Sequence, residues 1–545
     1  MIESQSGSDM ATWAEKLGVR GGSASLGGFR FRGIQNQAVI SVVLFLLSIL
    51  AAWQAAQWIS AGQTKMLIFA GMAFVLCAIA LTILRSWRMG FYLFIVWLMF
   101  EDLIRKYLGN NMAIYFAKDV LAGLTYISLF VAIRRGRAKL FRPPFLLFFA
   151  FFFWLAVLQI FNPYSPSVLY GILGMKLQFY YVPLMFVGYA LVRDDRDLWR
   201  FLIVFMILAG VVSALGIIQA VVGPTFLNPA TLAPDIQELG SLEKVVPSSN
   251  QAFLLPSSVF VSTGRFAAFL VVATIVGLGA VGYFILSKLR RRKVVLVGIG
   301  LIAVAVLLSG SRTAFMYSLI STTALTVAYL WGAPVRGGQG RRLMKAIRRS
   351  VIFAAIGLAI FFVLFPSAAS SRFDFYSQTL SPGSSSYELG FRAWNYPIGE
   401  LLKAFSDPHW AVGNGTGTAS LGGQYVSKLV GPSSNVSVEE GYGQLILEMG
   451  ILAPFLWILW TAALLWSSWK VVRTLKRTRL FPIAIAILWY AFILLYPLTF
   501  LGIDIYENFV NNAFLWILVG ILFRLPDFVT VPPAPEIIAA GAVRI

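Results

Sequence analysis

The sequence predicts an all-α membrane protein with many transmembrane helices, and three of its properties lead to this fold class. Hydrophobic residues make up 59% of the 545-residue chain, charged residues make up 12%, and the mean hydropathy is +0.78. Apolar runs long enough to cross a bilayer follow one another along most of the chain. Lys and Arg collect in alternate short segments between these runs. A soluble protein of this length has no interior that could bury so many apolar side chains.

With about 20 apolar residues per crossing, the chain is predicted to form about fourteen spans. The third span is expected to be short or broken, because Glu101, Asp102, Arg105 and Lys106 follow its apolar stretch at residues 91–100. The expected centres are residues 48, 75, 97, 124, 152, 183, 209, 275, 301, 322, 358, 454, 490 and 516.

The basic segments predict how the chain is oriented in the membrane. Cytoplasmic loops carry an excess of Lys and Arg, so these segments are expected to face the cytoplasm. Their alternation places both termini in the cytoplasm and two long polar loops outside. The basic segments are residues 85–88, 134–142, 193–200, 288–293, 336–349 and 470–479.

This topology divides the chain into seven segments. The larger outer loop is expected to be a partly helical cap with an amphipathic piece at residues 391–405, since structureless stretches of such length usually carry function. The segments are a cytoplasmic tail (1–35), N-terminal transmembrane helices (36–222), an outer loop (223–263), transmembrane helices with a Ser-Arg-Thr motif (264–365), a large outer loop (366–438), C-terminal transmembrane helices (439–525) and a second cytoplasmic tail (526–545).

Charge and composition also exclude several partners. The net charge of +21 does not indicate a nucleic-acid partner, because the basic residues form short clusters between apolar runs. The single cysteine, Cys77, lies inside an apolar run, which excludes a disulfide framework and a cysteine metal cluster. With one histidine, His409, a zinc site is not expected either. We therefore expect no metal and no other cofactor.

The basic residues that topology does not explain lie on the predicted outer face. Arg312, in Ser309-Gly-Ser-Arg-Thr-Ala314, separates two apolar runs, and Arg265 begins another span from the same side. A guanidinium donates hydrogen bonds in pairs and stays charged, so these arginines favour an anionic ligand such as a lipid-linked diphosphate. The alternatives are a side chain of Arg312 that reaches from the helix end to the interface, and solvated loop charges for Arg372 and Lys428.

Carboxylates follow the large loop where it returns to the membrane. Glu439 and Glu440 are candidates for a general base that accepts a proton from an attacking hydroxyl. Carboxylates at a helix N-terminus are also favoured by the helix dipole, which is the alternative explanation. Glu448 is expected to point into the bundle as a packing partner or a supporting acid. His409 is a weaker candidate base, because a lone histidine in a loop is more often structural or exposed.

A glycine-rich stretch in the large loop predicts a turn and not a nucleotide-binding loop. Residues 413–417 read Gly-Asn-Gly-Thr-Gly, but no strand is predicted before them and they lack the lysine of a nucleotide-binding loop. We expect a turn that allows a close backbone approach.

These motifs together resemble those of the bacterial O-antigen ligase and O-antigen polymerase superfamily. The features are the Ser-Arg-Thr motif at Arg312, then Arg392-Ala-Trp394 and the Pro408 to Gly417 turn in the large loop, and a closing helix from Tyr442 to Gly450. The similarity covers roughly residues 260–460. It implies that Arg312 and Arg265, with Arg392, hold the diphosphate of an undecaprenyl-diphosphate-linked glycan. It also implies a bacterial inner-membrane protein whose outer loops and active face are periplasmic.

The sequence departs from the family at one position. Ligases of the family have His-Asn before the last helix, whereas Glu439 and Glu440 stand here. This favours a metal-independent glycosyltransferase that polymerises units of exopolysaccharide, capsule or O-antigen onto an acceptor glycan. The alternatives are an O-antigen ligase, a transporter or flippase for an anionic lipid-linked substrate, and a noncatalytic subunit that works with other polysaccharide assembly proteins.

Overall fold

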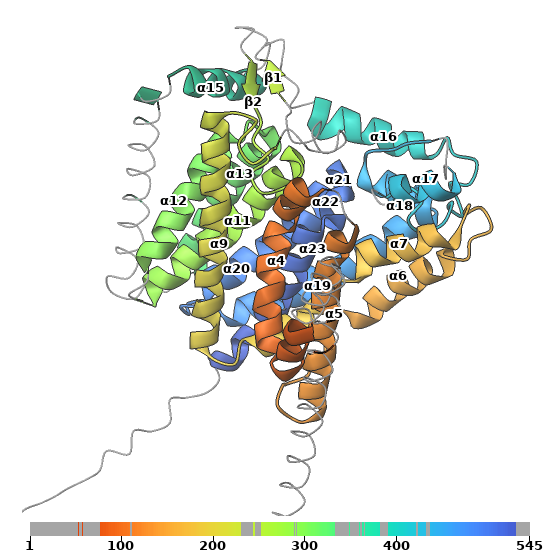
Figure 1. The fold of residues 1–545 in the computed structure, drawn as a ribbon, viewed down its shortest axis with the longest axis horizontal. Helices are drawn as coiled ribbons and strands as arrows, with labels where there is room; N and C mark the ends of the chain where they lie inside the picture. The colour runs from red at the N-terminus through yellow and green to blue at the C-terminus, as the bar shows by residue number, and fades with distance from the viewer. Residues whose placement is uncertain are drawn as a thin grey trace, which may run out of the picture. The chain divides into compact units, whose positions relative to one another are not determined.

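The computed structural model describes residues 77–109, 112–229, 243–245, 252–287, 292–332, 366–381, 391–420, 423–431 and 436–529, with residues 53, 57, 289, 348, 359, 362 and 363. The chain divides into two units, Met1–Leu81 and Thr82–Ile545, and the architecture below is that of the second. This unit is almost entirely helical, as predicted (Figure 1).

Helices make up the first half of this unit up to a short hairpin. They are α4 (Trp87–Leu108), α5 (Met112–Arg134), α6 (Leu146–Gln159), α7 (Val168–Phe179), α8 (Leu184–Leu191) and α9 (Asp195–Val222). Strands β1 (Glu243–Val245) and β2 (Ala252–Leu254) pair antiparallel, with Lys244 opposite Phe253.

The second half contains the remaining elements. These are α11 (Thr263–Leu286), α12 (Arg292–Leu308), α13 (Arg312–Gly332), α15 (Pro366–Leu380), η1 (Phe391–Asn395), α16 (Tyr396–Ala404), α17 (Gly423–Val430), α18 (Gly441–Met449), α19 (Leu452–Thr474), α20 (Phe481–Ile493), η2 (Leu494–Leu498), α21 (Thr499–Leu501), α22 (Asp504–Glu507), α23 (Phe509–Arg524) and η3 (Leu525–Phe528).

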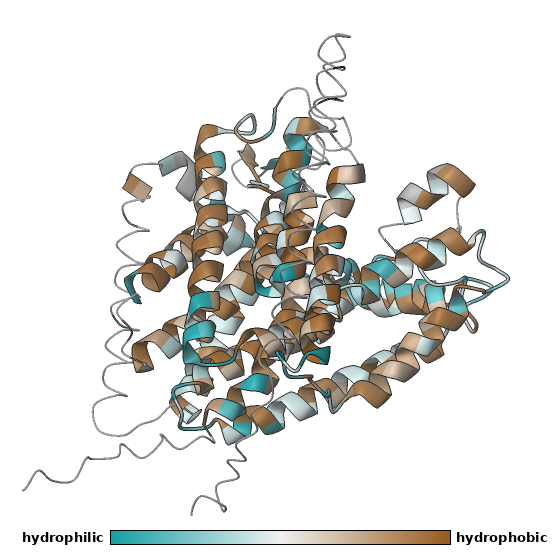
Figure 2. Ribbon diagram, turned by 60° about the horizontal axis from the view of Figure 1, so that its bottom comes forward, coloured by the Kyte–Doolittle hydropathy of each residue, from teal (hydrophilic) through white to brown (hydrophobic). Residues whose placement is uncertain are grey.

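Side-chain caps set where several of these helices begin. Ser167, Asp194, Ser262 and Asn508 each accept a hydrogen bond from a backbone N–H in the first turn of α7, α9, α11 and α23. Such caps satisfy donors that have no partner within the helix. Figure 2 shows hydrophobic residues along most of each helix, with hydrophilic residues concentrated at helix ends and in the connecting segments.

Seven of the described helical segments are long and apolar enough to cross a membrane. They correspond to the predicted spans centred at residues 124, 209, 275, 322, 454, 490 and 516. The segments are Ala113–Arg134, Asp195–Val222, Thr263–Leu286, Arg312–Gly332, Leu452–Thr474, Phe481–Leu501 and Phe509–Phe528. The protein is therefore an all-α protein with apolar helices of membrane-spanning length. The predicted spans centred at residues 48, 75 and 358 lie mostly outside the described residues.

Two expectations about individual spans were wrong. The third span is not broken: α4 is a continuous helix of 22 residues that includes all four charged residues. These charges are accommodated because their side chains are buried and paired, as described below. The span centred at residue 183 is instead divided into α7 and α8 around Pro183, whose ring cannot donate a backbone hydrogen bond.

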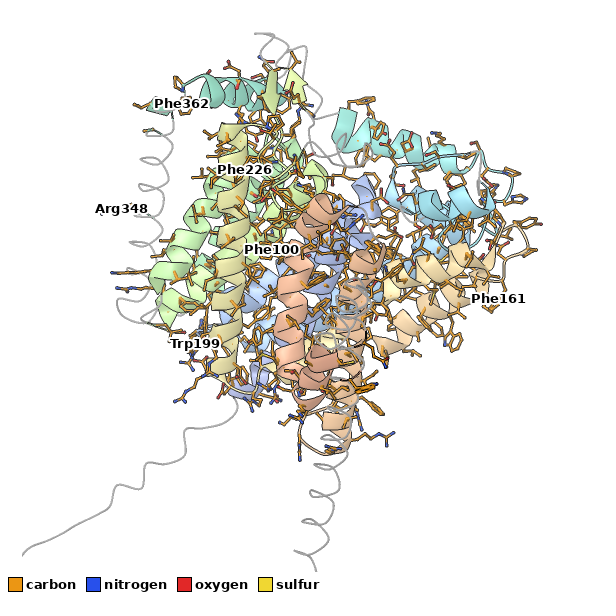
Figure 3. All side chains as sticks on the ribbon, viewed as in Figure 1. Phe100, Phe161, Trp199, Phe226, Arg348 and Phe362 are labelled. Carbon is orange, nitrogen blue, oxygen red and sulfur yellow. The ribbon has the colours of Figure 1, made fainter. Side chains whose placement is uncertain are left out.

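The helices connect two ends, which we call the upper and lower ends as drawn in Figure 1. Figure 3 shows Trp199, near the start of α9, at the lower end and Phe226, just beyond α9, at the upper end. Successive long helices alternate in direction, so the described parts of the basic segments collect at the lower end.

Contacts across the lower end confirm this grouping. Arg88 of α4 pairs with Asp197 of α9 at 3.1 Å. Asp195 of α9 accepts a hydrogen bond from the Tyr283 hydroxyl at 2.7 Å and pairs with Arg479 at 3.4 Å. Residues far apart in sequence therefore meet at the end where the charge pattern placed them.

The polar segments predicted as loops contain structure of their own. Residues 366–438 include α15, η1, α16 and α17, so the expectation of a partly helical segment is confirmed. The predicted amphipathic piece at residues 391–405 corresponds to η1 and α16. In Figure 1, α15 and α16 lie across the upper end of the spanning helices.

Candidate functional site

Five basic side chains from four helices gather at the upper end, where α4 ends and α5 and α11 begin. We call this group the cation cluster. Three carboxylates pair with its members: Glu101 and Asp102 of α4, and Asp119 of α5. The members of the cation cluster are Arg105, Lys106, Lys118, Lys176 and Arg265.

Asp102 holds two of these arginines. Its carboxylate lies 2.8 and 3.1 Å from Nη1 of Arg265 and 3.2 Å from Nη1 of Arg105. The backbone N–H of Val261 donates a third contact to it at 3.3 Å. Asp102 is 1% exposed, so its charge is stabilised by these donors and not by water. Because Ser262 caps α11, Arg265 lies in the first turn of that helix and faces α4.

The two lysines of α5 and α7 have carboxylate partners as well. Lys118 Nζ lies 2.9 Å from Glu101 Oε1, and both side chains are fully buried. Lys176 Nζ lies 2.9 Å from Asp119 Oδ2, and this pair retains 15% and 10% exposure. The Tyr181 hydroxyl donates to the other oxygen of Asp119 at 2.7 Å. The Lys118 pair is therefore internal, whereas the Lys176 pair lies at the edge of the cluster.

Aromatic rings lie between the cations. The ring of Tyr115 is 3.5 Å from Lys118 Nζ, 4.2 Å from Lys176 Nζ and 5.2 Å from the guanidinium carbon of Arg105. Phe509, at the start of α23, lies 4.5 Å from Lys118 Nζ and 4.9 Å from the guanidinium carbon of Arg265. The negative face of an aromatic ring compensates part of the cost of removing a cation from water.

Lys106 is held mainly by neutral groups. Its ammonium donates to the Ser257 hydroxyl and to the Ser258 carbonyl, each at 3.0 Å. Both serines are fixed in turn, because their N–H groups donate to Oε1 of Gln219 at 2.9 and 2.6 Å. Lys106 is 2% exposed, so its amino group is removed from water at this position.

The balance of charge gives the cluster its chemical character. Five basic groups face three partner carboxylates, which leaves an excess of positive charge among apolar helices. Charged side chains in such surroundings are costly and are typical of functional sites. The Arg265 side chain is 25% exposed, so an incoming anion can reach the cluster through it, whereas the Lys176 ammonium is covered. The arrangement fits a phosphate or diphosphate.

Short elements connect the cluster to the carboxylates of the upper end. Phe509 follows α22, and the Tyr506 hydroxyl of α22 donates to the carbonyl of Gln178 on α7 at 3.0 Å. The N–H of Ile503 donates to Oε1 of Gln444 on α18 at 3.3 Å. The segment Ile503–Phe509 thus borders the cation cluster on one side and α18 on the other.

Glu440 is the N-cap residue of α18. Its two carboxylate oxygens accept hydrogen bonds from the N–H groups of Tyr442, at 2.9 Å, and Gly443, at 2.6 Å. This is the helix-terminus role considered as the alternative to catalysis. Glu440 is 1% exposed, and burial raises the pKa of its carboxyl to about 7.

Glu439 has a more accessible carboxylate. Its side chain is exposed and accepts a hydrogen bond from the Tyr396 hydroxyl at 2.5 Å. Its own N–H donates to Oε2 of Glu400 on α16 at 2.9 Å, which fixes the backbone. Nearby Asp504 is half-buried, and burial together with the charge of Glu439 raises the pKa of Asp504 to about 6. Of the two predicted base candidates, Glu439 is the one whose carboxylate a substrate can approach.

Glu448 points into the bundle, as expected. It is 2% exposed, and its carboxylate accepts from Nε2 of Gln178 and from the N–H of Ala419, each at 3.2 Å. The same amide of Gln178 lies 3.4 Å from Oε1 of Glu507. The three side chains join α7, α18 and α22, so Glu448 is a supporting residue.

The glycine-rich turn makes the close approach that its sequence predicted. Gly413, Gly415 and Gly417 have φ values of +82°, +104° and +82°. A Cβ atom at Gly417 would lie 2.1 Å from the carbonyl oxygen of Tyr170, and one at Gly413 would lie 2.5 Å from that of Glu448. Only glycine combines such backbone angles with such contacts. The turn packs directly against α7 and α18.

His409 has structural contacts. Its ring stacks on Tyr164 with 3.9 Å between centroids, and its Nδ1 lies 3.0 Å from Oδ1 of Asn414. Asn414 is tied to α18, because its N–H donates to the carbonyl of Leu447 at 2.7 Å. These contacts join the α6–α7 connection to the glycine turn, which matches the structural interpretation of this histidine.

The predicted arginines fall into different surroundings. Arg265 belongs to the cation cluster, whereas the guanidinium carbon of Arg312 lies 4.4 Å from the centre of the Phe375 ring of α15. Arg372, expected as a solvated loop charge, is instead buried, because it donates to the carbonyls of Leu308 and Leu254 at 2.9 and 3.0 Å. Arg392 lies in η1, and its side chain is outside the described part of the chain, as is that of Lys428.

Sequence reasoning missed most of the cation cluster. Its signal was present in Glu101, Asp102, Arg105 and Lys106, which follow an apolar run with the spacing of one helix face. We interpreted these charges as the end of a span. Lys176 lies singly in an apolar run and Lys118 lies in one beside Asp119, and an intramembrane charge is itself an indication of function.

Comparison with protein-family models found no match, and neither did comparison with curated proteins.

Proposed function

We propose that this protein is a membrane glycan polymerase that joins undecaprenyl-diphosphate-linked oligosaccharide units at its upper end, on the periplasmic face of the bacterial inner membrane. The observation that carries this proposal is the excess of positive charge in the cation cluster, which the segment Ile503–Phe509 connects to α18, the helix that follows the exposed carboxylate of Glu439. The cations can stabilise an anionic leaving group, and the carboxylate can accept the proton of an acceptor hydroxyl.

In this proposal, the donor diphosphate binds at Arg265 and Lys176. Arg312 and Arg392 are proposed as further contacts of the donor, as the family resemblance implies. The acceptor hydroxyl attacks the anomeric carbon of the donor glycan while its proton passes to Glu439. The bond between that carbon and the diphosphate oxygen breaks, and undecaprenyl diphosphate leaves. Fixed cations stabilise the negative charge that develops on the leaving oxygen, so the step needs no metal.

A lipid transporter or flippase is the second candidate, and one observation favours it. The helix pair α7 and α8 is interrupted near buried charges, and interrupted helices beside charges are common in transporters. The cluster, however, lies at the ends of α4, α5 and α11, whereas a transport route needs polar groups along the whole bundle. This position favours the enzyme. A ligase differs from the polymerase only in its acceptor.

The test is a reaction of purified protein in lipid nanodiscs with radiolabelled undecaprenyl-diphosphate-linked repeat units. A polymerase converts them into a ladder of longer products, whereas a transporter leaves them unchanged. Arg265→Gln is expected to lower the rate at least a hundredfold, and Arg312→Ala is expected to abolish long products.

Arg193→Ala is the matched control, because Arg193 is an exposed arginine of the lower end. Its ladder should equal that of the parent protein. Absence of a ladder from the parent protein would exclude the polymerase, and an unchanged ladder from Arg265→Gln would exclude the assigned donor site.

A further inference from the structure

Helix α5 presents an apolar stripe to the bilayer that ends at the cation cluster. Its members lie on one face at helical spacing and are 39–59% exposed. They are Phe116, Val120, Ile127, Phe130 and Val131. We call them the α5 stripe. On its opposite face, the same helix carries Lys118 into the cluster.

The charged edge of the cluster borders the top of this stripe. Lys176 Nζ lies 4.5 Å from the centre of the Phe116 ring and 2.9 Å from Asp119. Tyr180 lies beside them, because its hydroxyl donates to the Asp119 carbonyl at 2.5 Å and lies 3.1 Å from the position of a Cβ atom on Gly123. The Lys176–Asp119 pair, whose Nζ and Oδ2 atoms are covered, therefore lies where an exposed apolar helix face meets a group of buried cations.

We propose that an isoprenoid lipid with a phosphate or diphosphate headgroup reaches the cation cluster from the bilayer along the α5 stripe, with Lys176 as the first cation that its headgroup contacts. This inference rests on the proposed function, which requires such a lipid as donor, and it names the route and the residues that bind its chain. Asp119 holds Lys176 until the headgroup replaces it.

The dimensions fit a lipid lying in one leaflet. From Phe116 to Ile127 the helix rises about 16 Å at about 1.5 Å per residue, and Phe130 and Val131 extend the stripe about 6 Å further. The hydrocarbon of one leaflet is roughly 15 Å thick, half of a bilayer core. The headgroup then lies at the upper end and the chain extends toward the bilayer centre. The stripe is a single row of side chains, which matches one isoprenoid chain better than the two chains of a phospholipid.

Direct contact can be tested by cross-linking. Photoreactive benzoylphenylalanine in place of Val120, which is 59% exposed, should cross-link radiolabelled undecaprenyl diphosphate in phosphatidylcholine nanodiscs. The same group in place of Val327 of α13, which is 61% exposed, is the matched control and should give only background. Excess unlabelled undecaprenyl diphosphate should remove the Val120 signal. Equal labelling at both positions, or equal competition by phosphatidylglycerol, would overturn the proposed route.

The headgroup contact needs a variant that leaves no unpaired buried charge. The double substitution Asp119→Asn and Lys176→Gln removes the ion pair while an amide oxygen still accepts from Tyr181. It should weaken undecaprenyl diphosphate binding at least tenfold and leave undecaprenol binding unchanged. Lys139→Gln, at an exposed lysine of the lower end, is the control. Unchanged affinity in a double variant that elutes as the folded protein would refute the role of Lys176. Equally tight binding of inorganic diphosphate would refute the contribution of the α5 stripe.

The outcomes separate this site from the polymerase itself. Specific cross-linking and binding without a product ladder would support the lipid site and reject the polymerase. A product ladder together with binding that does not depend on the Asp119–Lys176 pair would reject the site alone.

Discussion

The upper and lower ends both contain clustered arginines and lysines, but the two groups differ in burial. At the lower end, Arg193, Arg200 and Arg479 are 64%, 59% and 52% exposed around Asp195 and Asp197. In the cation cluster, the ion-paired basic side chains are 0–25% exposed. Exposed ion pairs contribute roughly 0–1 kcal/mol, whereas removing one partner of a buried pair costs about 3–5 kcal/mol. The lower charges are therefore stabilised largely by water, whereas the upper charges depend on partners that the fold supplies.

The largest expected effect comes from breaking the most buried pair. Lys118→Met leaves the Glu101 carboxylate buried without its partner, so the free energy of unfolding should fall by about 3–5 kcal/mol. Unfolding of the purified protein in mixed micelles, followed by circular dichroism, measures this change. The double variant Glu101→Gln, Lys118→Met removes both charges and should recover most of the loss. If the Lys118→Met variant were as stable as the parent protein, the Glu101 carboxylate would not need Lys118 as its partner.

A smaller effect is expected from pH. The pKa of Glu440 is about 7 in the folded protein against an ordinary value of 4.5, so the folded state binds this proton more tightly. Stability should therefore decrease as pH rises from 4.5 to 7 and then level off with respect to this group. Glu440→Gln keeps an oxygen for the cap but does not titrate. Its melting temperature should change less between pH 5 and pH 8, and an identical pH profile would contradict the assignment.

The smallest effect is expected at the lower end. Arg193→Ala removes an exposed partner of Asp197, and Arg88 still pairs with that carboxylate at 3.1 Å. The free energy of unfolding should change by roughly 0–1 kcal/mol. The same micelle unfolding experiment checks it. A loss as large as that of Lys118→Met would remove the distinction between the two ends.

The residues that were predicted well are those whose conformation or direction depends on their own chemistry and their neighbours in sequence. The glycines at 413, 415 and 417 required unusual backbone angles wherever the loop lay, and they have them. Glu448 could not face lipid, so it had to point inward, and it does. Arg372 was misplaced because nothing near it in sequence shows that two backbone carbonyls of distant segments would receive it.

The sequence alone determined the helical membrane class and the end at which the basic segments gather. Both properties follow from the free-energy cost of exposing peptide groups and charges to hydrocarbon. This cost depends on the residues of each segment and not on its neighbours in the fold. Only the tertiary structure decided that Arg265 meets Asp102, that Lys118 meets Glu101 and that α4 continues through its charges. Ion pairs between helices depend on which faces pack together, and the pattern of a single helix does not contain that information.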